Sequence, residues 1–179
     1  MIDGIKIVGG KGERRALDFY PTPPECTKAL LKYLNLKPGA MVWEPAAGDG
    51  SMARVLTEHG CRVISTDIQT GTDFLTAALP DEKIEWIITN PPFNKSVEFI
   101  QHCAELERPF ALLLKAQYWH SAKRKPLFDE IRPTAILPLT WRPDFSGQGA
   151  SLLDMQWTVW EQNWLDITLY QPLSKPKEA

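Results

Sequence analysis

The sequence MVWEPAAGDGSMARVLTE, residues 41–58, predicts a strand, a tight turn and a helix in direct succession. Its first three residues are apolar, its turn contains Gly48 and Gly50, and residues 52–58 have helical spacing of apolar side chains. Small residues between a buried strand and a helix N-terminus allow a ligand to approach the backbone closely. The stretch therefore predicts an α/β fold with a ligand site at its strand–helix junction.

Strands and helices are predicted to alternate on both sides of this stretch. Hydrophobic periodicity predicts further strands at residues 62–66, 84–89, 110–114 and 135–139, and further helices at residues 23–34, 95–106 and 123–131. Two closing β-rich runs, residues 154–160 and 166–170, are expected to form an antiparallel edge pair. Such an alternation indicates a mostly parallel sheet with helices on both faces.

The chain has 179 residues, 44% of them hydrophobic, which is enough for a single domain with one core. We expect residues 1–15 to be a flexible N-terminus and residues 174–179 a disordered tail, because neither has hydrophobic periodicity. The net charge of -2 excludes binding of nucleic acid through overall positive charge, so a polyanion would need a local basic patch.

No apolar run is long enough for a membrane helix or a signal sequence, so we expect a cytoplasmic protein with no membrane partner. The cysteines Cys26, Cys61 and Cys103 are far apart and show no ligand spacing. They are predicted to be buried thiols, with neither a disulfide framework nor a metal site.

Acidic residues around the glycine turn discriminate between cofactors. Asp67 ends the second strand about twenty residues beyond the glycines, where a carboxylate can accept hydrogen bonds from both hydroxyls of a ribose. Glu44 and Asp49 would repel a pyrophosphate, and the turn lacks the third glycine of the GxGxxG motif. These charges suit a cofactor with an ammonium group and a sulfonium charge but no phosphate. S-adenosylmethionine is such a molecule.

The segment after the second strand offers groups for the adenine of this cofactor. The Asp73 side chain can accept a hydrogen bond from the adenine amino group, and either Phe74 or Ile68 can pack on the ring. From local sequence alone, Asp73 is equally well explained as the cap of a turn or helix.

The tetrapeptide Asn90-Pro91-Pro92-Phe93 follows a central strand, at the end where open α/β sheets place their chemistry. The two prolines fix φ and lack N–H donors, which leaves a stiff turn rich in acceptors. An aromatic amine is a poor nucleophile, because its lone pair is delocalised into the ring. If the Asn90 side-chain oxygen and the Pro91 carbonyl accept its two hydrogens, the lone pair can face a methyl donor. Phe93 offers a surface on which a base can stack after leaving a helix.

With these motifs the chain resembles the class I S-adenosylmethionine-dependent methyltransferases, and among them the N6-adenine DNA methyltransferases with an Asn-Pro-Pro-Phe motif. Residues 19–25 are similar to that family's N-terminal cofactor motif. The resemblance implies that the cofactor is held by Tyr20, Thr22, Glu44, Pro45, Ala46, Gly48, Gly50, Asp67, Ile68, Asp73 and Phe74, and that Asn90, Pro91, Pro92 and Phe93 are catalytic. It also implies a Rossmann-like, mostly parallel seven-stranded sheet with an antiparallel hairpin at one edge.

The implied activity is methylation of the exocyclic N6 amine of adenine in DNA. Related motifs occur in enzymes that methylate RNA bases, at guanine N2 or adenine N6, and in enzymes that methylate the glutamine N5 amide of proteins, so these remain alternatives. A basic and aromatic segment predicts substrate contacts at Lys123, Arg124, Arg142 and Phe145, although a solvated helix face explains part of it equally well. Residues 1–179 are interpreted as one methyltransferase domain without a target-recognition domain, as in a compact phage or mobile-element enzyme, acting as a monomer or homodimer. We therefore expect low sequence specificity.

Overall fold

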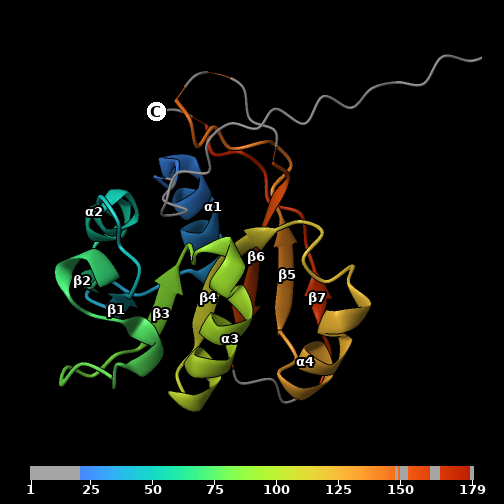
Figure 1. The fold of residues 1–179 in the computed structure, drawn as a ribbon. Helices are drawn as coiled ribbons and strands as arrows, with labels where there is room; N and C mark the ends of the chain where they lie inside the picture. Colours follow the sequence, from blue (N-terminus) through green and yellow to red (C-terminus); the bar gives the residue numbers. More distant parts are fainter. Residues whose placement is uncertain (1–20, 148, 150–152, 162–165, 178–179) are drawn as a thin grey trace, which may run out of the picture.

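A seven-stranded sheet forms the centre of the computed structural model, which describes residues 21–147, 149, 153–161 and 166–177 (Figure 1). The strand order across the sheet is β2-β1-β3-β4-β6-β5-β7. The strands are β1 (Met41–Glu44), β2 (Arg62–Ser65), β3 (Trp86–Thr89), β4 (Phe110–Lys115), β5 (Ala135–Pro138), β6 (Met155–Trp160) and β7 (Leu169–Tyr170). The predicted α/β architecture and the mostly parallel sheet are confirmed. The predictions for residues 1–15, for Tyr20 and for the last two residues lie outside the described part of the chain.

The position of the reversed strand differs from the prediction. β6 runs antiparallel to both β4 and β5, whereas all the other neighbouring strands are parallel. The expectation that the two closing runs pair with each other is wrong, because β7 pairs with β5. All six residues of β6 are buried, which requires a neighbour on each side, whereas both residues of β7 are exposed, as suits an edge.

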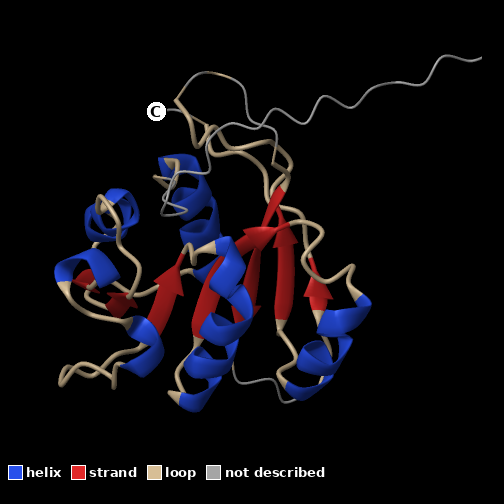
Figure 2. Ribbon diagram, in the orientation of Figure 1, coloured by secondary structure: helices blue, strands red, loops and turns tan. Residues whose placement is uncertain are grey.

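Helices cover both faces of the sheet (Figures 1 and 2). The helices α1 (Pro24–Leu34) and α2 (Ser51–Glu58) pack on one face, against a core that includes Val42 and Ile88. The helices α3 (Ser96–Glu105) and α4 (Lys125–Glu130) pack on the other face, which is the front in Figure 1. Side chains of a strand alternate between faces, so Trp43 and Ile87 belong to this second core. Within the described residues, no helix has the length and apolar character needed to cross a membrane.

Short 3-10 turns connect the sheet to its helices. They are η1 (Ile68–Thr70), η2 (Phe74–Thr76), η3 (Phe93–Lys95) and η4 (Ala122–Arg124). Two of the predicted helices therefore begin later than expected, because η3 precedes α3 and η4 precedes α4. The three cysteines are buried and unpaired, as their spacing predicted.

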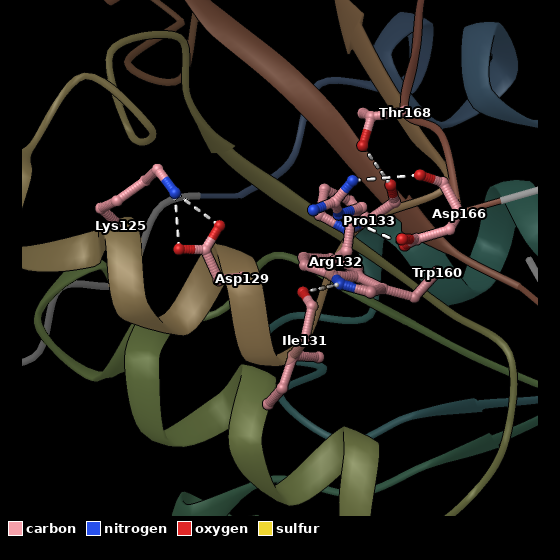
Figure 3. A network of polar contacts seen from close by, with 8 residues as sticks. All are labelled: Lys125, Asp129, Ile131, Arg132, Pro133, Trp160, Asp166 and Thr168. Atoms are coloured by element: carbon pink, nitrogen blue, oxygen red, sulfur yellow. Dashed lines mark hydrogen bonds and ion pairs between the residues drawn. The ribbon is translucent and has the colours of Figure 1, made fainter.

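Hydrogen bonds hold β6 and the segment before β7 in place. The Trp157 indole donates to the Cys26 carbonyl oxygen at 2.9 Å, which links β6 to α1. At the last residue of β6, the Trp160 indole donates to the Ile131 carbonyl oxygen at 2.9 Å (Figure 3). Before β7, the Arg132 guanidinium donates to the Asp166 carbonyl oxygen at 3.0 Å and also lies 3.5 Å from its carboxylate (Figure 3). The last two contacts tie β6 and the segment before β7 to the residues that follow α4.

Candidate active site

A cavity of about 290 Å³ lies where β1, β2 and β3 end. Because the three strands are parallel and adjacent, the residues that end or follow them meet at one edge of the sheet. Most of the predicted cofactor and catalytic residues line this cavity: Thr22, Glu44, Pro45, Ala46, Gly48, Asp67, Ile68, Asp73, Phe74, Asn90 and Pro92. Residues separated by almost 70 positions in sequence are thus brought into one site.

Three of the other predicted cofactor and catalytic residues lie close by without lining the cavity. Gly50 is the N-cap of α2, with φ of 75°. Pro91 is buried beside Pro92, and Phe93 lines a second cavity instead. Tyr20 lies outside the described residues.

The predicted substrate residues are distributed over a wider area. Arg124 lines the second cavity with Phe93, whereas Lys123 is exposed on η4 and lines neither cavity. Arg142 is exposed and paired with Asp154 at 2.8 Å. Phe145 packs against the core on the α1 face of the sheet. Only Arg124 is therefore brought next to the Asn90–Phe93 turn.

The Asp67 carboxylate holds the glycine turn to the end of β2. One of its oxygens accepts a hydrogen bond from the Gly48 N–H at 2.9 Å, and the other accepts one from the Gln69 N–H at 2.8 Å. The turn itself requires glycine, because Gly48 and Gly50 have φ of 54° and 75°. A carboxylate oxygen has more than one lone pair, so Asp67 can still accept hydrogen bonds from a ligand's hydroxyl groups.

Glu44 is a buried acid at the end of β1 that lines the cavity. It is 2% exposed, and its Oε2 atom has no hydrogen-bonding partner among the described residues. The pKa of Glu44 is raised to about 8, mainly by burial and to a lesser extent by the nearby Asp49 and Asp67, against the opposing effects of the Ala53 N–H and the Arg54 guanidinium. At neutral pH this carboxyl is therefore mostly protonated, and a cationic ligand would favour its ionised form.

Beyond Asp67, the cavity is lined by an exposed apolar side chain and by a buried aromatic ring. Ile68 is 63% exposed, so its side chain can pack on a planar ligand. Phe74 is buried, with its ring centroid 4.7 Å from that of Phe99 and 5.2 Å from that of Trp43. The Asp73 carboxylate caps η2 by accepting a hydrogen bond from the Leu75 N–H at 3.0 Å, and it also lines the cavity.

The Asn90 amide is oriented by a hydrogen bond to Thr22. Its Nδ2 atom donates to the Thr22 hydroxyl oxygen at 3.1 Å, across 68 residues of sequence. Its Oδ1 atom is buried and has no hydrogen-bonding partner among the described residues. With the nitrogen bound, the oxygen is left as the acceptor that the cavity can offer to a ligand's N–H group.

The sequence motifs missed several residues that line the cavity, among them Ser51, Met52, Gln69, Leu75, Lys95 and Phe99. Met52 and Phe99 belong to the first turns of α2 and α3, the helices that follow β1 and β3. The first turn of a helix that follows a site strand faces the same edge of the sheet. The position of Met52 and Phe99 at the start of these two predicted helices could therefore have identified them as cavity residues.

Protonation of Glu44 makes the stability of the free protein depend on pH. Between about pH 4.5 and pH 8 the unfolded chain loses the Glu44 proton while the folded chain retains it. We therefore expect the protonated Glu44 to make its full contribution to the unfolding free energy below about pH 4.5. Between about pH 4.5 and pH 8 the unfolding free energy should fall by at most about 1.4 kcal/mol per pH unit. Urea unfolding at several pH values compares the wild type with Glu44→Gln, whose amide does not titrate. Parallel pH profiles of the two proteins would contradict the raised pKa.

No protein-family model and no curated protein matches the sequence. Solved structures do match. One is a protein from Listeria monocytogenes assigned as a class I S-adenosylmethionine-dependent methyltransferase. It matches with TM-score 0.61 and 12% identity over 85% of this chain and 65% of that one. A protein from Pyrococcus horikoshii assigned as an RNA methyltransferase matches with TM-score 0.58 and 16% identity over 86% and 90% of the two chains. A modification subunit assigned to a type I restriction enzyme from Vibrio vulnificus matches with TM-score 0.59 and 12% identity over 96% of this chain and 49% of that one. This chain thus spans slightly under two thirds of the Listeria protein and about half of the Vibrio subunit. Identities this low establish the fold alone: the chain has the Rossmann-like fold of class I methyltransferases.

Proposed function

We propose that this chain transfers the methyl group of S-adenosylmethionine to the exocyclic N6 amine of adenine in DNA. The observation that carries the proposal is that Asn90 lines the cavity and that its buried Oδ1 atom has no hydrogen-bonding partner among the described residues. An acceptor held in this way suits an amine hydrogen, which a neutral aromatic amine can supply. The resemblance of the Asn90–Phe93 turn to the adenine-N6 family supports adenine as the base.

The described residues fit S-adenosylmethionine in charge and shape. Asp67 would accept hydrogen bonds from the ribose hydroxyls, and Ile68 and Asp73 would contact the adenine. The orphaned Glu44 carboxyl would ionise beside the cationic methionine end of the cofactor, which explains why a buried acid lies in this cavity. When bound, the cofactor supplies a methyl carbon activated by its positive sulfur. The cavity volume of about 290 Å³ is close to the lower limit for sites that hold ligands of this general size.

Asn90 would act by preparing the target nitrogen for attack. Its Oδ1 atom accepts one amine hydrogen and the Pro91 carbonyl accepts the other, so that the nitrogen becomes more tetrahedral and its lone pair points at the methyl group. The bound cofactor would supply its methyl group to this lone pair, and the surplus proton of the amine would leave to solvent.

An RNA base, either guanine N2 or adenine N6, is the second candidate target. It is favoured by the similarity to the Pyrococcus horikoshii protein, which extends over 90% of that chain, whereas the Vibrio restriction-modification subunit is matched over 49% of its length. A glutamine N5 amide of a protein is the least supported alternative.

Asn90 and Asp67 should affect different steps. We expect Asn90→Ala to lower methyl transfer to DNA by roughly 10²–10³-fold, the usual loss when one oriented polar group is removed from a reacting centre, with cofactor Kd within about twofold of the wild type. Asp67→Ala should instead weaken cofactor binding first, because its carboxylate faces the ribose. Single-turnover transfer and calorimetric cofactor binding separate the two effects. Transfer at the wild-type rate by Asn90→Ala would refute the mechanism.

Thr22 should act as a positioning residue for Asn90. Thr22→Val removes the hydroxyl that accepts from Asn90 Nδ2 at 3.1 Å, so the amide can rotate and present its nitrogen to the target amine. We expect kcat to fall by about tenfold or more with little change in the KM for DNA, and Thr22→Ser to restore most of the rate because it keeps the hydroxyl. Equal kcat values for the valine and serine variants would contradict this role.

A further inference from the structure

A second cavity, of about 150 Å³, lies next to the proposed active site. Pro92 lines the first cavity and Phe93 lines the second, so the turn that carries Asn90 contributes a wall to both. The lining of the second cavity consists of Phe93, Ser96, Lys115, Gln117, Tyr118 and Arg124. The second cavity therefore adjoins the place where the target base would bind.

The charged groups of the second cavity are both cations. Lys115 ends β4, and Arg124 ends η4. Arg124 is held in place by a hydrogen bond from its Nη1 atom to the Tyr118 carbonyl oxygen at 2.8 Å, and its guanidinium lies 4.0 Å from the centroid of the Tyr118 ring. The lining contains no acid, and the nearby Glu98 is paired with Lys95 at 3.2 Å. The cavity therefore favours an anion.

The Tyr118 hydroxyl is an unused donor at this cavity. Tyr118 is 4% exposed, and its hydroxyl oxygen is buried beside the Arg124 guanidinium, with no acceptor for the hydroxyl hydrogen among the described residues. Leaving a buried hydroxyl hydrogen without an acceptor is unfavourable, and a ligand that accepts its hydrogen bond would remove that cost. Lysine and arginine side chains are donors only, so all three groups suit a ligand that consists of acceptors.

Lys115 connects this cavity to the surface on which the base would stack. Its ammonium nitrogen lies 4.5 Å from the centroid of the Phe93 ring. A cation–π contact at an exposed lysine is weak, whereas a charge-assisted hydrogen bond to a phosphate is stronger. A phosphate in the second cavity would therefore draw the ammonium group away from the ring and uncover that face for the base.

We propose that the second cavity binds a backbone phosphate of the nucleic-acid strand that carries the target base, through Lys115, Tyr118 and Arg124. The proposal rests on the proposed function, because it assumes that the target is part of a polynucleotide. In the free protein Lys115 covers Phe93, and in the complex it binds the phosphate. Entry of the strand and exposure of the stacking surface are thereby coupled.

Salt-dependent binding of a fluorescent oligonucleotide tests the site without requiring catalysis. Loss of one phosphate contact should weaken binding about equally for all sequences and reduce the slope of log K against log salt by about one. We expect this result for Lys115→Met, with cofactor Kd unchanged. Lys83→Met removes the same charge from an exposed residue before β3, at the opposite end of that strand from Asn90, and should bind like the wild type.

Tyr118→Phe separates binding from folding. It deletes only the hydroxyl, so we expect oligonucleotide binding to weaken by several-fold while the unfolding free energy stays the same or rises. The phosphate site would be overturned if Lys115→Met and Tyr118→Phe both bound the oligonucleotide with the affinity and salt slope of the wild type. It would also be overturned if the wild-type protein bound no oligonucleotide. A wild-type protein that binds with the expected salt slope but transfers no methyl group would overturn the proposed reaction and leave the phosphate site supported.

Discussion

Parallel pairing of β1 with both β2 and β3 is the constraint on which the site depends. It brings Glu44, Asp67 and Asn90, each at the end of a different strand, to the same edge of the sheet. The Asp67 carboxylate then fixes the glycine turn through the Gly48 N–H, so the cavity between the strand ends keeps its shape. Helices on both faces bury the strands and leave this edge as the place where polar side chains can meet a ligand.

Three residues that line the two neighbouring cavities each have a buried polar group whose hydrogen-bonding capacity is not used within the part of the chain that the structure describes. The groups are Glu44 Oε2 and Asn90 Oδ1 at the first cavity and the Tyr118 hydroxyl at the second. Each lowers the stability of the free protein, since burial removes water without supplying a hydrogen bond. Each also matches a group expected from the substrates: an ammonium, an amine hydrogen and a phosphate. The free protein thus retains unfavourable groups where binding of its ligands would satisfy them.

The sequence was sufficient for the strands, the helices and most of the cavity lining. Apolar runs identified the strands, and the turn residues that follow β1 and β3 identified the reactive edge, because strand ends of a parallel sheet share one location. The place of β6 could not be read in this way, since the choice of neighbouring strands depends on burial in the assembled sheet. The hydrogen bond between Asn90 and Thr22 and the contact of Lys115 with Phe93 were equally inaccessible, because both join separate segments of the chain.

Transfer of a methyl group to adenine in DNA is tested most directly by identifying the methylated product. The wild-type chain is incubated with S-adenosylmethionine labelled in its methyl group and with DNA, RNA or protein, and each polymer is then digested to monomers. We predict label in N6-methyldeoxyadenosine from DNA, at a level that Asn90→Ala does not reach. Label in methylguanosine from RNA or in methylglutamine from protein would contradict adenine in DNA as the target, and no label in any polymer would contradict methyl transfer to these substrates altogether.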